Sequence, residues 1–103
     1  VTVSRHAAPV WSLRVETVLP PVRGRRRLAH QVRQDLWRDL QGLRGFAPAV
    51  EVSLVHGATR VVAGGTVASR SFPKARAEAQ IAALLEDPAH RVRWVRCAGG
   101  QDA

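Results

Sequence analysis

The longest helical pattern in the chain covers residues 25–43, which read RRRLAHQVRQDLWRDLQGL. Its apolar residues recur at intervals of three and four, as on the buried side of an amphipathic helix. They are Ala29, Val32, Leu36, Leu40 and Leu43, with Leu28 and Trp37 widening the stripe. Gly42 and Gly45 stand where a helix C-cap is expected. The pattern predicts one long helix with a core on one side of it.

Residues 10–18, which precede this helix, alternate between apolar and polar side chains. Trp11, Leu13 and Val15 share one face, and polar residues occupy the other. This period of two predicts a half-buried strand. Pro20-Pro21 then ends the strand, because prolines cannot donate to a sheet ladder.

Two further strands are predicted after the helix, at residues 50–56 and 60–68. They are separated by a short turn at His56–Thr59, which indicates a hairpin. Gly64-Gly65 inside the second of these strands indicates a bulge or a close approach of another backbone.

A second helix and a last strand complete the pattern. Ser71 is a plausible N-cap for the helix, and Pro88 is expected to stop it. The apolar stripe of this helix consists of Ala77, Ile81, Leu84 and Leu85. Residues 91–97, in which Val92 and Trp94 fall on one face, are expected to form the final strand.

The order of elements is therefore β-α-β-β-α-β. With right-handed crossovers, this order predicts a ferredoxin-like α+β sandwich. Its four-stranded antiparallel sheet would have the order 4-1-3-2, with two helices on one face. At 103 residues the chain is expected to form one domain, over residues 9–98. Residues 1–8 and 99–103 would be a flexible lead-in and a flexible tail.

Several classes of protein are excluded by composition. The single cysteine, Cys97, rules out an intrachain disulfide framework, and the four histidines show no metal-ligand spacing. No metal and no cofactor are therefore expected. No apolar run approaches the ~20 residues that span a bilayer. The first residues lack the apolar core of a secretory signal, so a cytoplasmic protein is expected.

The net charge of +8 is concentrated in two segments. Residues 20–45 hold seven arginines against Asp35 and Asp39, and residues 88–97 hold three arginines and no acid. In the rest of the chain, acidic and basic residues balance. A basic surface of this kind is typical of proteins that bind polyanions.

The expected fold would bring these two basic segments to the same end of the molecule. The predicted anion-binding and nucleic-acid-binding residues there are Arg23, Arg25, Arg26, Arg27, Arg60, Arg91 and Arg93, close to His56 and His90. Guanidinium groups and the N–H groups of a helix N-terminus can bind the same phosphate. Glu86 and Asp87 are expected at this end too, and an ordinary salt-bridged corner is the alternative interpretation.

No catalytic site is predicted, so the chain is not expected to be an enzyme. Its expected layout resembles that of the acylphosphatases, but that family relies on an asparagine on the sheet, and the chain contains no asparagine. The leading prediction is a non-catalytic domain whose arginines bind the phosphates of nucleic acid, with RNA favoured over DNA.

Stacking of bases on the sheet is not expected, because the outward strand positions carry no aromatic residue. The alternative function is an accessory or oligomerising subunit that docks an acidic protein or a small anion. A homodimer through the open sheet face would use Val55, Val62 and Val95.

Overall fold

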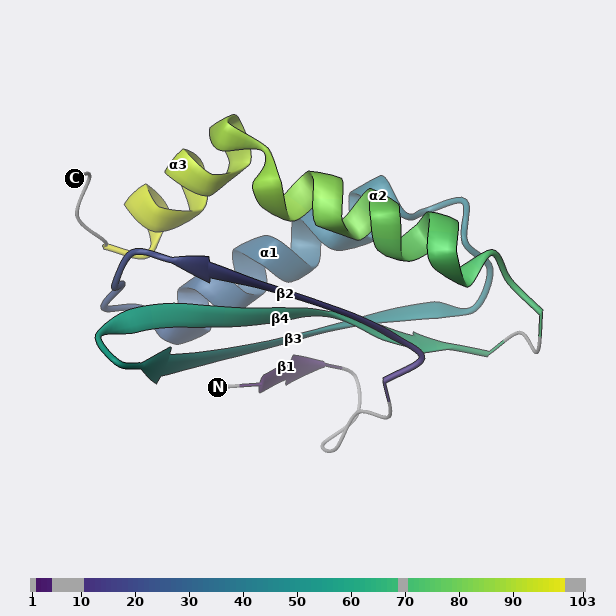
Figure 1. The fold of residues 1–103 in the computed structure, drawn as a ribbon, viewed down its shortest axis with the longest axis horizontal. Helices are drawn as coiled ribbons and strands as arrows, with labels where there is room; N and C mark the ends of the chain where they lie inside the picture. Colours follow the sequence, from purple (N-terminus) through teal and green to yellow (C-terminus); the bar gives the residue numbers. More distant parts are fainter. Residues whose placement is uncertain (1, 5–10, 69–70, 100–103) are drawn as a thin grey trace.

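The computed structural model describes residues 2–4, 11–68 and 71–99 of the chain. Within these residues, three helices cover one face of a single sheet (Figure 1). The strands are β1 (Thr2–Ser4), β2 (Leu13–Leu19), β3 (Phe46–Val55) and β4 (Ala58–Val67). The helices are α1 (Arg25–Asp39), α2 (Lys74–Glu86) and α3 (Pro88–Cys97). The predicted mixed α+β class is confirmed. Most of the expected lead-in, and the expected tail from residue 100 onward, lie outside the described residues.

The sheet has the order β1-β3-β4-β2, and every pair of neighbours is antiparallel. The strands expected at 10–18, 50–56 and 60–68 correspond to β2, β3 and β4. The ferredoxin-like sandwich is nevertheless wrong, because residues 91–97 belong to helix α3 and form no strand beside β2. The fold therefore has a third helix in place of the predicted last strand. None of the described helices combines the length and apolar composition needed to cross a membrane.

Helix α3 begins at Pro88, the residue that was expected only to stop the preceding helix. The side chain of Asp87 caps it by accepting hydrogen bonds from the backbone N–H groups of Ala89 and His90. Pro88 takes the first helical position, where its missing N–H removes no helical hydrogen bond. As a result Trp94 points into the core, where it is completely buried.

The core lies between the sheet and the three helices. Helix α1 packs against β3, and α2 packs against β2. Most of the predicted stripe of α1 is buried, with Leu28, Val32 and Leu36 fully inaccessible to solvent, but Trp37 is exposed. The helix is also shorter than predicted, since α1 ends at Asp39, before Leu40 and Leu43. The strands contribute Leu13, Leu19, Val50, Val52, Val61 and Ala63.

Gly64 and Gly65 allow the strands to approach one another closely. A side chain at Gly64 would overlap the carbonyl oxygen of Leu13 on β2. One at Gly65, where φ is +142°, would overlap the carbonyl oxygen of Ala47 on β3. The close backbone approach predicted for this pair is therefore confirmed.

Strand β2 forms one edge of the sheet, and side chains from the helices bind its backbone. The N–H of Arg14 donates to the carboxylate of Glu78 on α2 at 3.1 Å. The carbonyl oxygen of Val18 accepts from the guanidinium of Arg91 on α3 at 2.6 Å. Since an unpaired strand edge invites pairing with another chain, these contacts protect this edge.

Candidate functional site

The start of α1 and the end of α3 meet to form a groove at one end of the domain, which we call the basic groove. The backbone N–H of Gly24 donates to the carbonyl oxygen of Ala98 at 2.9 Å, which holds the two helices together. The groove has a volume of about 710 Å³. It is lined by Arg23, Gly24, Arg26, Arg27, His30, Gln31, Ala98 and Gly99.

Arg23, Arg25, Arg26 and Arg27, at this end of the domain, are all exposed. Among the described residues, no carboxylate lies within ion-pair distance of Arg23, Arg25, Arg26 or Arg27. Arg27 donates to the carbonyl oxygen of Cys97 at 3.4 Å. No acidic residue occupies the first turn of α1, so the positive end of the helix dipole adds to the charge.

Glu86 and Asp87 bind other parts of the domain. Glu86 accepts a hydrogen bond of 2.9 Å from the hydroxyl of Thr17 and lies 3.7 Å from the guanidinium of Arg91. Asp87 caps α3, and the hydrogen bond from the backbone N–H of His90 lowers the pKa of its carboxyl. Glu86 therefore pairs with one arginine of the predicted set, Arg91, whereas neither acid pairs with Arg23, Arg25, Arg26 or Arg27.

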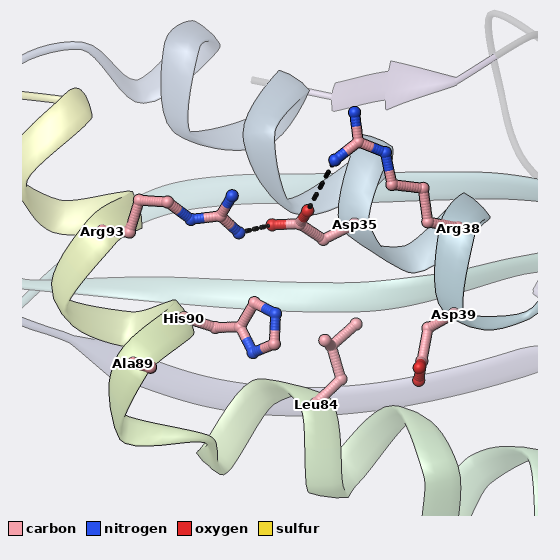
Figure 2. A pocket seen from close by; sticks show the side chains of 7 residues that line it. All are labelled: Asp35, Arg38, Asp39, Leu84, Ala89, His90 and Arg93. Atoms are coloured by element: carbon pink, nitrogen blue, oxygen red, sulfur yellow. Dashed lines mark hydrogen bonds and ion pairs between the residues drawn. The ribbon is translucent and has the colours of Figure 1, made fainter.

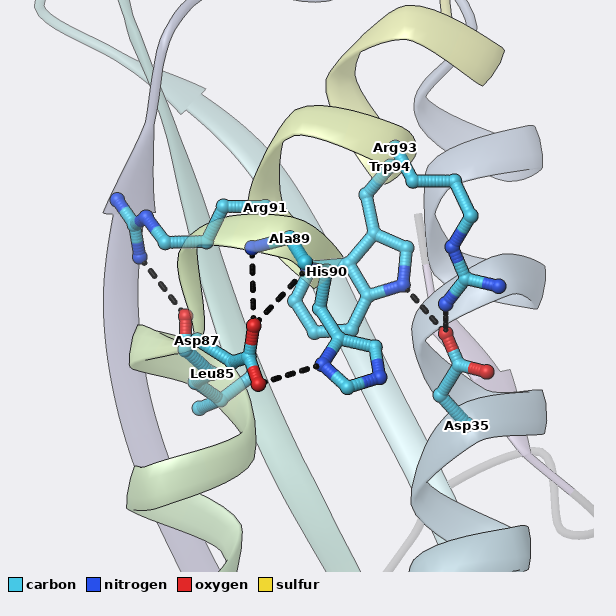
Figure 3. A network of polar contacts seen from close by, with 8 residues as sticks. All are labelled: Asp35, Leu85, Asp87, Ala89, His90, Arg91, Arg93 and Trp94. Carbon is cyan, nitrogen blue, oxygen red and sulfur yellow. Dashed lines mark hydrogen bonds and ion pairs between the residues drawn. The ribbon is translucent and has the colours of Figure 1, made fainter.

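Arg91 serves the structure of the domain. Its guanidinium donates to the hydroxyl of Thr17 and to the carbonyl oxygen of Leu85, each at 2.9 Å, and also to Val18. It thereby fastens α3 to the end of α2 and to β2, as part of the network in Figure 3.

Neither Arg60 nor Arg93 lines the basic groove. Arg60 lies on the open face of the sheet and binds Glu16, a contact that lowers the pKa of the Glu16 carboxyl. Arg93 binds Asp35 in the middle of α1. The predicted set is thus divided: Arg23, Arg26 and Arg27 line the basic groove and Arg25 is their exposed neighbour, whereas the other three arginines pair with groups of the domain.

Asp35 lies at a second, smaller pocket between α1 and the junction of α2 with α3 (Figure 2). The carboxylate is nearly buried and accepts a hydrogen bond of 2.7 Å from the indole Nε1 of Trp94. It also binds the guanidinium of Arg93 and lies 3.9 Å from that of Arg38. Asp35 therefore mainly joins α1 to α3.

His90 is the titratable ring in this second pocket. Its Nδ1 lies 3.3 Å from the Asp87 carboxylate, and its ring centroid is 5.6 Å from that of Trp94. No group of three or more potential metal ligands occurs among the described residues. Asp35 joins α1 to α3 through Arg93 and Trp94, whereas Arg38 contacts Asp35 within α1, and His90 contacts Asp87 and Trp94 (Figures 2 and 3).

Trp37 is a functional candidate that the helical pattern placed wrongly. The sequence assigns it to the edge of the buried stripe, but its side chain is 52% exposed. Its spacing from His30, seven residues before it, could have indicated the outward side of α1.

The apolar patch expected on the open sheet face is also reduced. Val62 is only 2% exposed, and Val95 is buried on α3, so Val55 alone of the three is an exposed strand residue. Cys97, expected inside a strand, is exposed at the end of α3.

Comparison with known proteins identifies no relative. No protein-family model, curated protein or solved structure matches the chain significantly.

Proposed function

We propose that this domain binds the phosphates of nucleic acid, RNA in particular, through the basic groove. The observation that carries the proposal is the group of four exposed arginines at the start of α1 without a carboxylate partner among the described residues. Unpaired guanidinium groups at the positive end of a helix attract phosphate oxygens, which they can bind through two parallel hydrogen bonds.

A polymer of phosphates suits this surface better than a single small anion. Arg26 and His30 follow one another along α1 at a spacing of about one helical turn, or ~6 Å. Arg23, which lines the groove, and Arg25, its exposed neighbour, continue the positive surface at the entry to the helix. Charges that recur along a line complement phosphates that recur along a strand, and each contact releases a bound counterion.

The proposal is tested with a variant that removes three of these charges. Arg23, Arg25 and Arg26 are changed together to alanine, and Arg27 is kept because it contacts the carbonyl of Cys97. Binding of a fluorescently labelled single-stranded RNA is measured by anisotropy from about 50 to 200 mM salt. We expect the wild-type affinity to fall steeply with salt, and the variant to bind more weakly with a shallower salt dependence.

The matched control removes three positive charges at the other end of the domain. Arg44, Lys74 and Arg76 are exposed and lie near the start of β3 and the start of α2, away from the start of α1. This control should retain most of the affinity. Equal losses in the two triple variants would mean that net charge alone attracts RNA, and no wild-type binding at low salt would overturn the proposal.

A further inference from the structure

The outward side of α1 continues the basic groove towards the exposed ring of Trp37. Trp37 lies eleven residues after Arg26 and seven after His30, spacings that place all three on one side of the helix. Gln34, three residues before the ring, shares this side. The three residues that share this side with Trp37 are therefore polar, and none of them is acidic.

The exposure of the Trp37 ring is unusual for a tryptophan. Trp94 is completely buried, while half of the Trp37 side chain remains accessible although α1 packs closely against the sheet. Tryptophan has the largest apolar surface of any residue, and burial of that surface would stabilise the domain. A flat aromatic ring beside cations is the combination that binds single-stranded nucleic acid.

The distance along α1 fits a short single strand. From Arg26 to Trp37 the helix rises about 16 Å, which corresponds to roughly five nucleotides at a stacked rise of 3.4 Å. Sites of this type contact about four to sixteen nucleotides. Asp39, the nearest exposed acid, lies towards α2, where its carbonyl oxygen accepts a hydrogen bond from Gln80.

We propose that Trp37 stacks on a base of single-stranded RNA whose phosphates occupy the basic groove. The inference rests on the proposed function and adds to it the preferred form of the ligand. Bases in a duplex already stack on one another and present only their edges, so Trp37 can stack only on an unpaired base. Gln34, one helical turn before Trp37, carries an amide that can hydrogen-bond to the edge of that base.

The test compares Trp37→Leu with Trp37→Phe. Leucine keeps an apolar side chain but removes the π-face, whereas phenylalanine keeps a smaller ring. Because the side chain is half exposed, neither change is expected to disturb the fold, which circular dichroism checks. Affinities are measured for a single-stranded RNA, its duplex and a single-stranded DNA of the same sequence.

We expect Trp37→Leu to weaken single-strand binding about tenfold, to leave duplex binding unchanged and to preserve the salt dependence. Trp37→Phe should recover most of the lost affinity. In the wild type, RNA should quench part of the tryptophan fluorescence, and Trp37→Phe should remove this quenching although Trp11 and Trp94 remain. Single-stranded DNA should show the same loss, since every base has a π-face.

The outcomes separate this inference from the proposed function. If the triple arginine variant binds RNA weakly and Trp37→Leu binds it as the wild type does, the stacking is overturned and phosphate binding stands. Equal losses of single-strand and duplex binding in Trp37→Leu would also overturn the stacking. If the arginine variant keeps full affinity, the proposed function itself fails.

Discussion

The carboxylate of Asp35 on α1 accepts a hydrogen bond of 2.7 Å from the indole Nε1–H of Trp94 on α3. The two residues are 59 positions apart in the sequence, and both are buried. The indole is thus a core side chain whose only polar atom has a partner, as buried tryptophans require. Asp35 also binds Arg93, so a single carboxylate joins two consecutive residues of α3 to α1.

Removal of this carboxylate should destabilise the domain. Asp35→Ala leaves the buried indole N–H of Trp94 without an acceptor, and we expect the free energy of unfolding to fall by about 2–4 kcal/mol. Asp35→Asn should lose less, since its amide oxygen can still accept from the indole. Urea denaturation measures both. Asp39→Asn, at an exposed position, is the control, and an Asp35→Ala variant as stable as this control would contradict the prediction.

Asp87 should make stability depend on pH in the acid range. The backbone N–H of His90 lowers the pKa of its carboxyl in the folded state. Its contribution is therefore complete above the unfolded-state pKa of about 3.9, and is lost as the pH falls through the lower folded-state value. We expect the difference in melting temperature between the wild type and Asp87→Ala to shrink over this range. Asp87→Asn, which keeps a capping oxygen without a charge, should remove this part of the pH dependence.

Replacement of Arg91 should lower the stability of the domain, whereas replacement of Arg26 should weaken RNA binding. Arg91→Ala removes hydrogen bonds to Thr17, Val18 and Leu85, and should lower the free energy of unfolding by about 1–3 kcal/mol. Arg26→Ala should change that free energy by no more than about 0.5 kcal/mol while weakening RNA binding. Thermal melts and anisotropy on the same samples measure both. Equal stabilities of the two variants would show that Arg91 does not fasten α3.

Gly64 should tolerate no side chain. Gly64→Ala places a methyl group against the Leu13 carbonyl oxygen, so either β2 moves away or the domain loses about 3 kcal/mol or more. Gly42→Ala is the matched control, because no atom lies within 4 Å of the added methyl group. Urea denaturation compares the two. A Gly64→Ala variant with wild-type stability would contradict the close approach of β2 and β4.

The elements that the sequence predicts correctly are those with a strong periodicity or a distinctive turn. The spacing of Leu28, Val32 and Leu36 identifies α1, and the alternation on both sides of the turn identifies β3 and β4. That turn has positive φ at His56 and Gly57, the conformation that two-residue hairpins favour. These features depend on neighbouring residues alone, which is why they can be read without a structure.

Helix α3 was missed because its sequence has two periods at once. Val92 and Trp94 alternate with arginines as in a strand, while Trp94 and Ala98 are four residues apart as on a helix. Asp87 followed by Pro88 decides between them, since an N-cap and a proline at the first position start a helix as readily as a proline ends one. With the last strand replaced by a helix, the predicted sheet order could not be correct.

The charges of the candidate site could be predicted from the sequence, but their partners could not. The arginine run at the start of α1 is visible directly, whereas Arg91 and Arg93 resemble it in composition and differ only in what they contact. Those contacts depend on how α3 packs against α1 and β2. Trp37 is exposed because it lies on the outward side of α1, which its spacing from His30 already indicates.

The contacts that Glu78 and Arg91 make with the outer edge of β2 would matter if many copies of the domain gathered on one polyanion. A polyanion that gathers basic domains raises their local concentration, and exposed strand edges would then join into continuous intermolecular sheets. Here a neighbour must first displace side chains that belong to α2 and α3. If the domain binds RNA as proposed, the protected β2 edge would oppose sheet formation between copies that lie close together on one RNA.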